Sequence, residues 1–76
     1  TVDKNSSKSE FNSAVLDSLN EISEEFQIMI ILRDFQELSY DMISNIMGIP
    51  IGTVKSRINR GRLKLVQLLN EKGYKK

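Results

Sequence analysis

The stretch that decides the fold is residues 40–58, YDMISNIMGIPIGTVKSRI. Its first part carries apolar residues at helical spacing and ends at Gly48, where a helix C-terminus favours a residue that adopts the left-handed conformation. Proline is well tolerated at a helix start, so Pro50 predicts a second helix from Ile51. Two helices joined by such a tight turn are typical of a helix-turn-helix. The alternative, from this pattern alone, is any pair of packed helices with a Gly-Ile-Pro turn.

The second helix of the pair is expected to be the recognition helix, from about Ile51 to about Leu69. Apolar residues recur along it at spacings of three and four, which predicts one buried face. This face holds Ile51, Val54, Ile58, Gly61, Leu65 and Leu68. The opposite face and its flanks hold Gly52, Thr53, Lys55, Ser56, Arg57, Asn59, Arg60 and Arg62. Side chains of these polar and basic types hold phosphates and read base edges in DNA.

The charge of the chain is divided unevenly between its two parts. Residues 1–48 carry nine acidic and three basic residues, whereas residues 49–76 carry eight basic residues and a single acid, Glu71. A solvated surface helix usually alternates Glu with Lys, because such pairs stabilise it. Residues 49–70 contain no acid at all. The pattern therefore favours a polyanionic partner over a merely solvated basic helix.

Towards the N-terminus, the sequence predicts three further helices. The short helix before Gly48 has Ser39 as its N-cap. The helix before that begins after Ser23, ends near residues 36–38 and is apolar around most of its girth, so it should be the most buried. The first helix begins at Ser9 and has a one-sided apolar pattern. The predicted fold class is all-α, a small four-helix domain containing a helix-turn-helix with a long C-terminal recognition helix.

One domain is expected, at residues 9–71. Residues 1–8 are polar and lack periodicity, which predicts a linker or disordered lead-in. Residues 72–76 are expected to form a flexible basic tail around Gly73. The chain starts at Thr1 rather than Met, so we expect it to be a domain of a longer protein.

The composition argues against several classes of function. The chain has no Cys and no His, which excludes a zinc finger and means that a metal site would have to consist of carboxylates alone. We expect no metal site, no cofactor and no catalytic residues. No run of 18 or more apolar residues could span a membrane. Several acids stand at predicted helix starts, where a structural role explains them. We therefore expect neither an enzyme nor a protein with a small-molecule substrate or a membrane partner.

Residues 38–62, LSYDMISNIMGIPIGTVKSRINRGR, resemble region 4 of bacterial sigma factors, and most closely the extracytoplasmic-function (ECF) group of the sigma-70 family. The run GTVKSR at 52–57, followed by Arg60 and Arg62, carries the resemblance most strongly. Arg33-Asp34 after an apolar run also matches, and the resemblance covers roughly residues 16–69. It implies promoter recognition in transcription initiation, because region 4 in that family docks on the promoter −35 element and on the flap of the RNA polymerase β subunit.

Carried over by position, the resemblance implies a role for each candidate residue. The residues implied to read bases in the major groove are Lys55, Ser56, Asn59 and Arg60. The residues implied to hold backbone phosphates are Arg33, Tyr40, Thr53, Arg57 and Arg62. The implied partners are double-stranded promoter DNA and the RNA polymerase core through its β-flap. The flap, or an anti-sigma factor, would meet the apolar surface of the first two helices, in a cytoplasmic protein.

The chain departs from the family pattern at a few positions, and two other functions stay open. Gly61 stands where the family usually has alanine, and Pro50 where a capping residue is common. The first alternative is a LuxR-type response-regulator output domain, which shares a Thr-Val-Lys segment. Arg57, Arg60 and Arg62 favour the sigma family over it. The second alternative is a protein-interaction module, targeted by an anti-sigma factor, whose acidic half is the binding surface.

Overall fold

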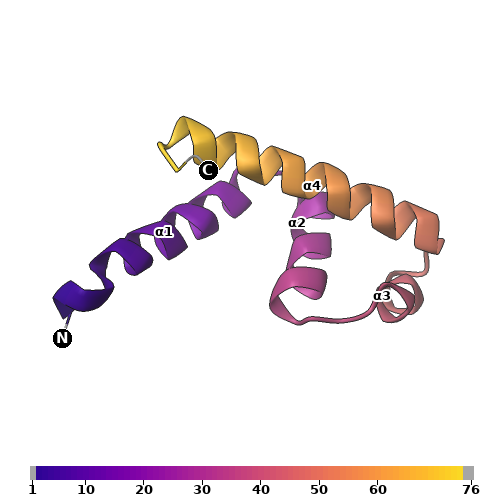
Figure 1. Cartoon of the computed structure of the whole chain (residues 1–76). Coiled ribbons are helices and arrows are strands. Elements are labelled where there is room, and N and C mark those ends of the chain that lie inside the picture. The colour runs from indigo at the N-terminus through magenta and orange to yellow at the C-terminus, as the bar shows by residue number, and fades with distance from the viewer. Residues whose placement is uncertain (1, 75–76) are drawn as a thin grey trace.

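The computed structural model describes residues 2–74, with side chains from Ser9 onward. The helices are α1 (Val2–Asn20), α2 (Glu24–Ile30), α3 (Tyr40–Met47) and α4 (Ile51–Glu71), and a π-helical segment, η1 (Ile31–Phe35), continues α2 (Figure 1). No strand occurs within the described part of the chain. The all-α fold with a long C-terminal helix is confirmed. Among residues 2–74, no helix is both long enough and apolar enough to cross a membrane.

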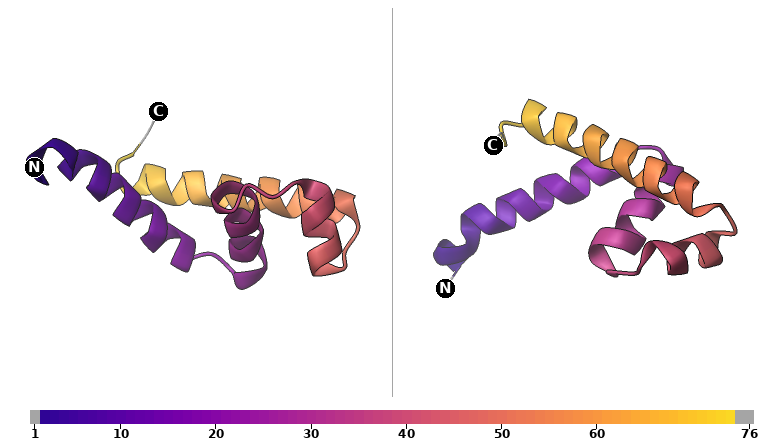
Figure 2. Two further views of the ribbon diagram at one scale, coloured as in Figure 1. Left: turned by 90° about the horizontal axis from the view of Figure 1, so that it is seen from below. Right: turned by 45° about the vertical axis from the view of Figure 1, so that its right-hand side comes forward.

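Helix α4 contacts each of the other three α-helices. Helix α3 packs near its N-terminal end, α2 crosses it in the middle, and the C-terminal part of α1 lies towards its far end (Figure 1). The two turned views in Figure 2 show the same arrangement and place the N-terminal half of α1 away from the other helices. The domain is therefore built around one long helix whose two ends have different neighbours.

The predicted turn between α3 and α4 is present and is closed by hydrogen bonds. Ser39 caps α3, because its hydroxyl accepts a hydrogen bond from the Met42 amide at 3.1 Å. Gly48 ends α3 with φ of 68°, a conformation that costs glycine little. The Ser44 hydroxyl donates to the Ile49 carbonyl at 2.6 Å. The Ser44 carbonyl accepts hydrogen bonds from the amides of Gly48 and Ile49. Ser44 thus ties the helix to the turn that follows it.

The core has two parts, of which the first lies under the helix-turn-helix. Its members are fully buried: Met29, Ile43, Val54 and Ile58. They come from α2, α3 and α4, so one cluster joins the turn to the middle of the domain. Burial of a side chain of this size contributes about 1.5–3 kcal/mol. This cluster is what holds the recognition helix in place.

The second part of the core lies where α4 crosses α2 and meets α1. Leu19, Ile22 and Ile30 form it, with Leu65 packed against them. Gly61 is buried at this crossing, and a Cβ added there would lie 3.0 Å from Ile30 Cδ1 and 3.2 Å from Phe26 Cβ. Glycine therefore permits the close approach of α4 to α2, which explains its place in a helix interior where alanine has the higher propensity.

The predicted start of the first helix was wrong. Helix α1 begins at Val2, not at Ser9, because residues 2–8 contain neither glycine nor proline and nothing stops the helix from extending. The flexible tail at residues 72–76 stays a prediction, and two of its described side chains make contacts. Lys72 pairs with Glu21 at 2.9 Å, and the Tyr74 ring packs edge-on against Phe11 with centroids 5.4 Å apart. Thr1, Lys75 and Lys76 lie outside the described residues.

Two burial predictions also need correction. The α2 helix is central, but only Met29 and Ile30 are buried in it, whereas Ile28 stays exposed. At the start of α4, Ile51 is exposed although the helical spacing placed it on the buried face. Ile51 is the first residue of α4, directly after the turn, and the packing of α3 there leaves more than a third of it exposed. Leu69, by contrast, is buried at the far end of α4.

Candidate nucleic-acid interface

The side of α4 that faces away from the core carries the four predicted base-reading residues. Lys55, Ser56, Asn59 and Arg60 are all exposed. They lie within the first half of α4, whose opposite side is held by the fully buried Val54 and Ile58. Rigid packing on one side of the helix therefore presents a row of hydrogen-bonding groups on the other, as groove reading requires.

The predicted phosphate-binding residues come from three elements. Thr53 and Arg57 lie half-buried on α4, at the edges of the exposed row. Tyr40 is the first residue of α3, and Arg33 belongs to η1. The structure thus brings side chains from distant parts of the sequence to the neighbourhood of the recognition helix.

Arg33 and Tyr40 are in direct contact. The Arg33 guanidinium donates to the Leu38 carbonyl at 2.9 Å and lies over the Tyr40 ring, 5.0 Å from its centroid. The Lys55 ammonium also lies over the Tyr40 ring, 5.9 Å from the centroid. One aromatic ring therefore contacts cations from η1 and from the recognition helix, within the distance at which a ring attracts a cation.

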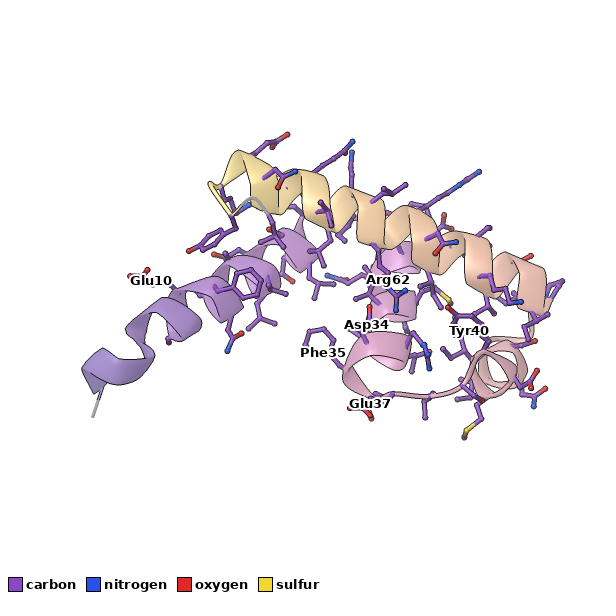
Figure 3. All side chains as sticks on the ribbon, viewed as in Figure 1. Glu10, Asp34, Phe35, Glu37, Tyr40 and Arg62 are labelled. Atoms are coloured by element: carbon purple, nitrogen blue, oxygen red, sulfur yellow. The ribbon has the colours of Figure 1, made fainter. Side chains whose placement is uncertain are left out.

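Arg62 is paired with an acid that faces it from η1. Its Nε donates to Asp34 Oδ2 at 3.1 Å and its Nη2 donates to Asp34 Oδ1, so the contact is bidentate (Figure 3). These hydrogen bonds to the Asp34 carboxylate raise the pKa of the Arg62 guanidinium, and the nearby Tyr40 adds to the effect. A planar guanidinium suits this two-point contact. Arg62 is therefore held in one orientation beside Tyr40.

The interpretation of the sequence assigned no role to Asp34. Its partner Arg62 lies 28 residues away in the chain, and no helical spacing connects them. The Leu38 carbonyl that holds Arg33 was likewise beyond prediction, since it depends on the turn after η1. That turn includes Glu37 with φ of 58°, which is uncommon for a residue with a side chain.

Together the fold and this surface define a helix-turn-helix DNA-binding domain of the kind found in transcription factors. The family model for sigma-70, region 4 matches residues 13–65. The chain belongs to this family, which confirms the resemblance seen in the sequence. The family is a non-catalytic transcription-factor domain, and the match supports promoter recognition in transcription initiation.

Curated proteins similar to the chain are ECF sigma factors. The chain is 43% identical over 54 residues to the ECF RNA polymerase sigma-E factor of Haemophilus influenzae. The aligned residues cover 71% of the chain and 29% of that protein. It is 46% identical over 52 residues to SigE of Mycolicibacterium smegmatis (68% of the chain, 19% of that protein). It is 34% identical over 62 residues to SigW of Bacillus subtilis (82% and 33%). The chain thus spans a fifth to a third of the length of these relatives.

Proposed function

We propose that this domain binds the −35 element of a promoter as part of an ECF sigma factor and tethers RNA polymerase there. The observation that carries the proposal is the exposed polar side of α4, which contains no acid over residues 49–70 and is fixed from behind by buried residues. The family match and the similarity to ECF sigma factors point the same way. Such a domain would act in the cytoplasm, where promoter DNA lies.

The mechanism is positioning rather than chemistry. Thr53 and Arg57 would hold backbone phosphates at the edges of the groove, together with Arg33, Tyr40 and Arg62 on its rim. Lys55, Ser56, Asn59 and Arg60 would read base edges. Phosphate contacts give affinity that falls with salt, whereas each good bidentate base contact contributes about 1–3 kcal/mol of discrimination.

Selection from a library of randomised duplexes at low salt tests the proposal. The protein should enrich a preferred sequence. Arg60→Ala should relax the preference at one base pair by about 1–3 kcal/mol. Arg57→Ala should weaken binding to all sequences alike and reduce the slope of log K against log salt by about 1.

A matched control uses another exposed cation of the same helix. Lys64 lies on α4 outside the predicted base-reading and phosphate-binding sets, so Lys64→Ala removes the same charge as Lys55→Ala. Lys64→Ala should leave the preferred sequence unchanged, whereas Lys55→Ala should alter it. Enrichment of no sequence by the folded protein, or equal effects of the two substitutions, would contradict direct reading by this face.

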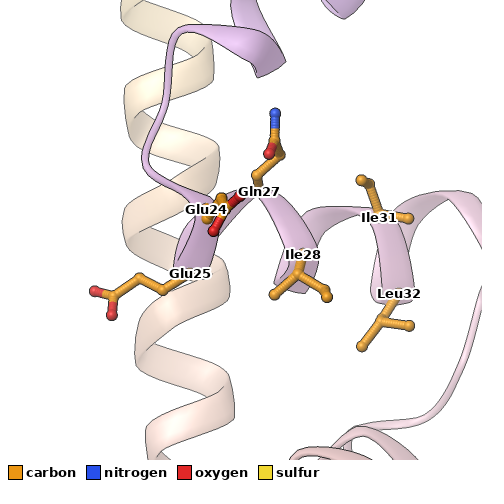
Figure 4. A pocket seen from close by; sticks show the side chains of 6 residues that line it. All are labelled: Glu24, Glu25, Gln27, Ile28, Ile31 and Leu32. Atoms are coloured by element: carbon orange, nitrogen blue, oxygen red, sulfur yellow. The ribbon is translucent and has the colours of Figure 1, made fainter.

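The contact with RNA polymerase is proposed to use an apolar surface of the first two helices. Ile28, Ile31 and Phe35 follow one another at helical spacing along α2 and η1, and all three are exposed. Figure 4 shows Ile28 and Ile31 in a pocket that Glu24 and Glu25 line at one end. Phe35 also lines a second groove with Leu16 of α1. Exposed apolar side chains gathered in this way mark a binding site for another protein.

We propose that the β-flap occupies this surface and that an anti-sigma factor blocks it. Leu16→Ala and Phe35→Ala together should weaken binding to the polymerase core while selection of DNA sequence stays unchanged. The control is Leu63→Ala, which removes an exposed leucine from α4 instead. Unchanged polymerase binding by the double variant, or an equal loss in Leu63→Ala, would contradict this assignment.

A further inference from the structure

The aromatic ring of Tyr40 contacts a residue of the recognition helix, and nothing in its predicted role as a phosphate ligand uses that contact. A phosphate would be bound through the phenol hydroxyl. The ring itself instead contacts the Arg33 guanidinium, 5.0 Å from the centroid, and the Lys55 ammonium, 5.9 Å away. Tyr40 is half-buried at the first turn of α3, so its ring is supported by the protein.

Lys55 needs such a support if it is to read a base. It is exposed, and no hydrogen bond or ion pair of its side chain occurs within the described part of the chain. A lysine carries its charge on a flexible four-carbon stem, so a free ammonium samples many positions. A cation held over an aromatic face is restrained by about 0.5–1 kcal/mol at an exposed site.

Arg33, the second cation in contact with the Tyr40 ring, is itself held in place. Its guanidinium is anchored by the Leu38 carbonyl at 2.9 Å, so it cannot move away without losing that bond. On the α4 side, the bidentate contact with Asp34 holds Arg62 near the same phenol. The ring is therefore bounded by anchored groups, and Lys55 is the contacting cation that stays free to reach outward.

We propose that Tyr40 is a positioning residue for Lys55, whose ring orients the ammonium towards the base pair that Lys55 reads. The proposal rests on the proposed function, because it deepens the reading of promoter DNA by α4. The two parts of the Tyr40 side chain then have different roles. The hydroxyl contributes affinity through a phosphate contact, and the ring contributes base specificity through Lys55.

The stack is tested first without DNA, by NMR of the side chains. Methylene protons next to the Lys55 ammonium should show an upfield ring-current shift relative to those of Lys64, which contacts no aromatic ring among the described residues. Tyr40→Phe should keep this shift and Tyr40→Leu should remove it. Absence of the shift in the unaltered protein would overturn the proposal, whatever the variants do.

The consequence is tested by selection from randomised duplexes, with the base pair that Lys55 reads identified by Lys55→Ala. Tyr40→Leu should reduce the preference at that base pair by about two- to fivefold, the factor that corresponds to the restraint. Tyr40→Phe should keep the preference and lower affinity for all sequences alike. In the Lys55→Ala background, Tyr40→Leu should cause no further change in preference.

The possible outcomes separate this inference from the proposed function. If the protein selects a sequence but Tyr40→Leu keeps the full preference, the positioning role is wrong and promoter reading stands. The same follows if Tyr40→Leu has an equal effect in the Lys55→Ala background. If the ring-current shift is present but no sequence is selected, promoter reading by this domain fails, and the base-reading role of the stack fails with it.

Discussion

Helix α4 has an N-terminal half and a C-terminal half that are stabilised in different ways. At the N-terminal half, Val54 and Ile58 are fully buried with Ile43, and the adjoining turn is closed by hydrogen bonds. Towards the C-terminal half, Leu65 is only partly buried, and α1 carries the buried Ser18 hydroxyl, which has no hydrogen-bond partner among the described residues. The half that presents the polar face is thus the more completely packed one. The fully buried side chains of α4 therefore lie directly behind the exposed face that is proposed to read DNA.

The largest expected effect is a loss of stability on the buried side of α4, compared with its exposed side. Ile58→Ala removes a fully buried side chain and should lower the free energy of unfolding by about 2–5 kcal/mol, because a cavity adds to the lost burial. Leu63→Ala, at an exposed leucine on the same helix, should change it by no more than about 0.5 kcal/mol. Urea unfolding followed by circular dichroism measures both. Similar losses in the two variants would mean that the packing does not differ between the two sides.

A pair of identical substitutions should have different effects in the two regions. Ser18→Ala removes a buried hydroxyl that has no hydrogen-bond partner within the described part of the chain, and it should raise the free energy of unfolding by about 1–3 kcal/mol. Ser44→Ala removes the 2.6 Å hydrogen bond to Ile49, which contributes about 0.5–1.5 kcal/mol. Both serines lie in helices, so the gain in helix propensity is common to both.

The difference between these two serine variants is the decisive quantity. Ser18→Ala should be more stable than Ser44→Ala by at least about 1 kcal/mol in thermal or urea unfolding. If the two variants have equal stability, the hydroxyl of Ser44 does not fasten the turn, and the contrast between the two regions is lost.

The local features of the helix-turn-helix were predictable, because each depends on residues that are close together in the sequence. Ser39, Gly48 and Pro50 each stand at the end or start of a helix, and each does so for a reason that needs no tertiary structure. The exposed row on α4 followed from helical periodicity in the same way. The family resemblance rested on these same residues.

What could not be predicted depends on contacts between distant residues. Asp34 meets Arg62, and Lys72 meets Glu21, across separations of 28 and 51 residues. Periodicity also cannot show which side of an apolar helix other elements leave uncovered. The exposure of one side of α2 and η1 was therefore not predicted. The burial of Gly61 against Ile30 needed the helix crossing itself.

The smallest expected effect concerns that crossing, at the boundary between the two regions. Gly61→Ala gains about 1 kcal/mol of helix propensity, but its Cβ would lie 3.0 Å from Ile30 Cδ1. Since Ile30 is buried and cannot easily move, the variant should be no more stable than the unaltered protein. In the Ile30→Val background, which lacks Cδ1 but leaves Phe26 Cβ 3.2 Å from the added Cβ, Gly61→Ala should be less unfavourable to stability than it is in the unaltered protein. Equal effects in the two backgrounds would show that close packing does not explain the glycine.

The most direct test of the central claim is an NMR titration of the labelled protein with a selected duplex at low salt. Amide shifts should concentrate at residues 53–62 and at Arg33, and they should weaken as salt is raised. They should also weaken in a variant with both Lys55→Ala and Arg60→Ala, while the amides of α1 stay unmoved. If the amides of residues 53–62 remain still in a folded protein, the exposed face of α4 does not read DNA, and the account given for this domain is contradicted.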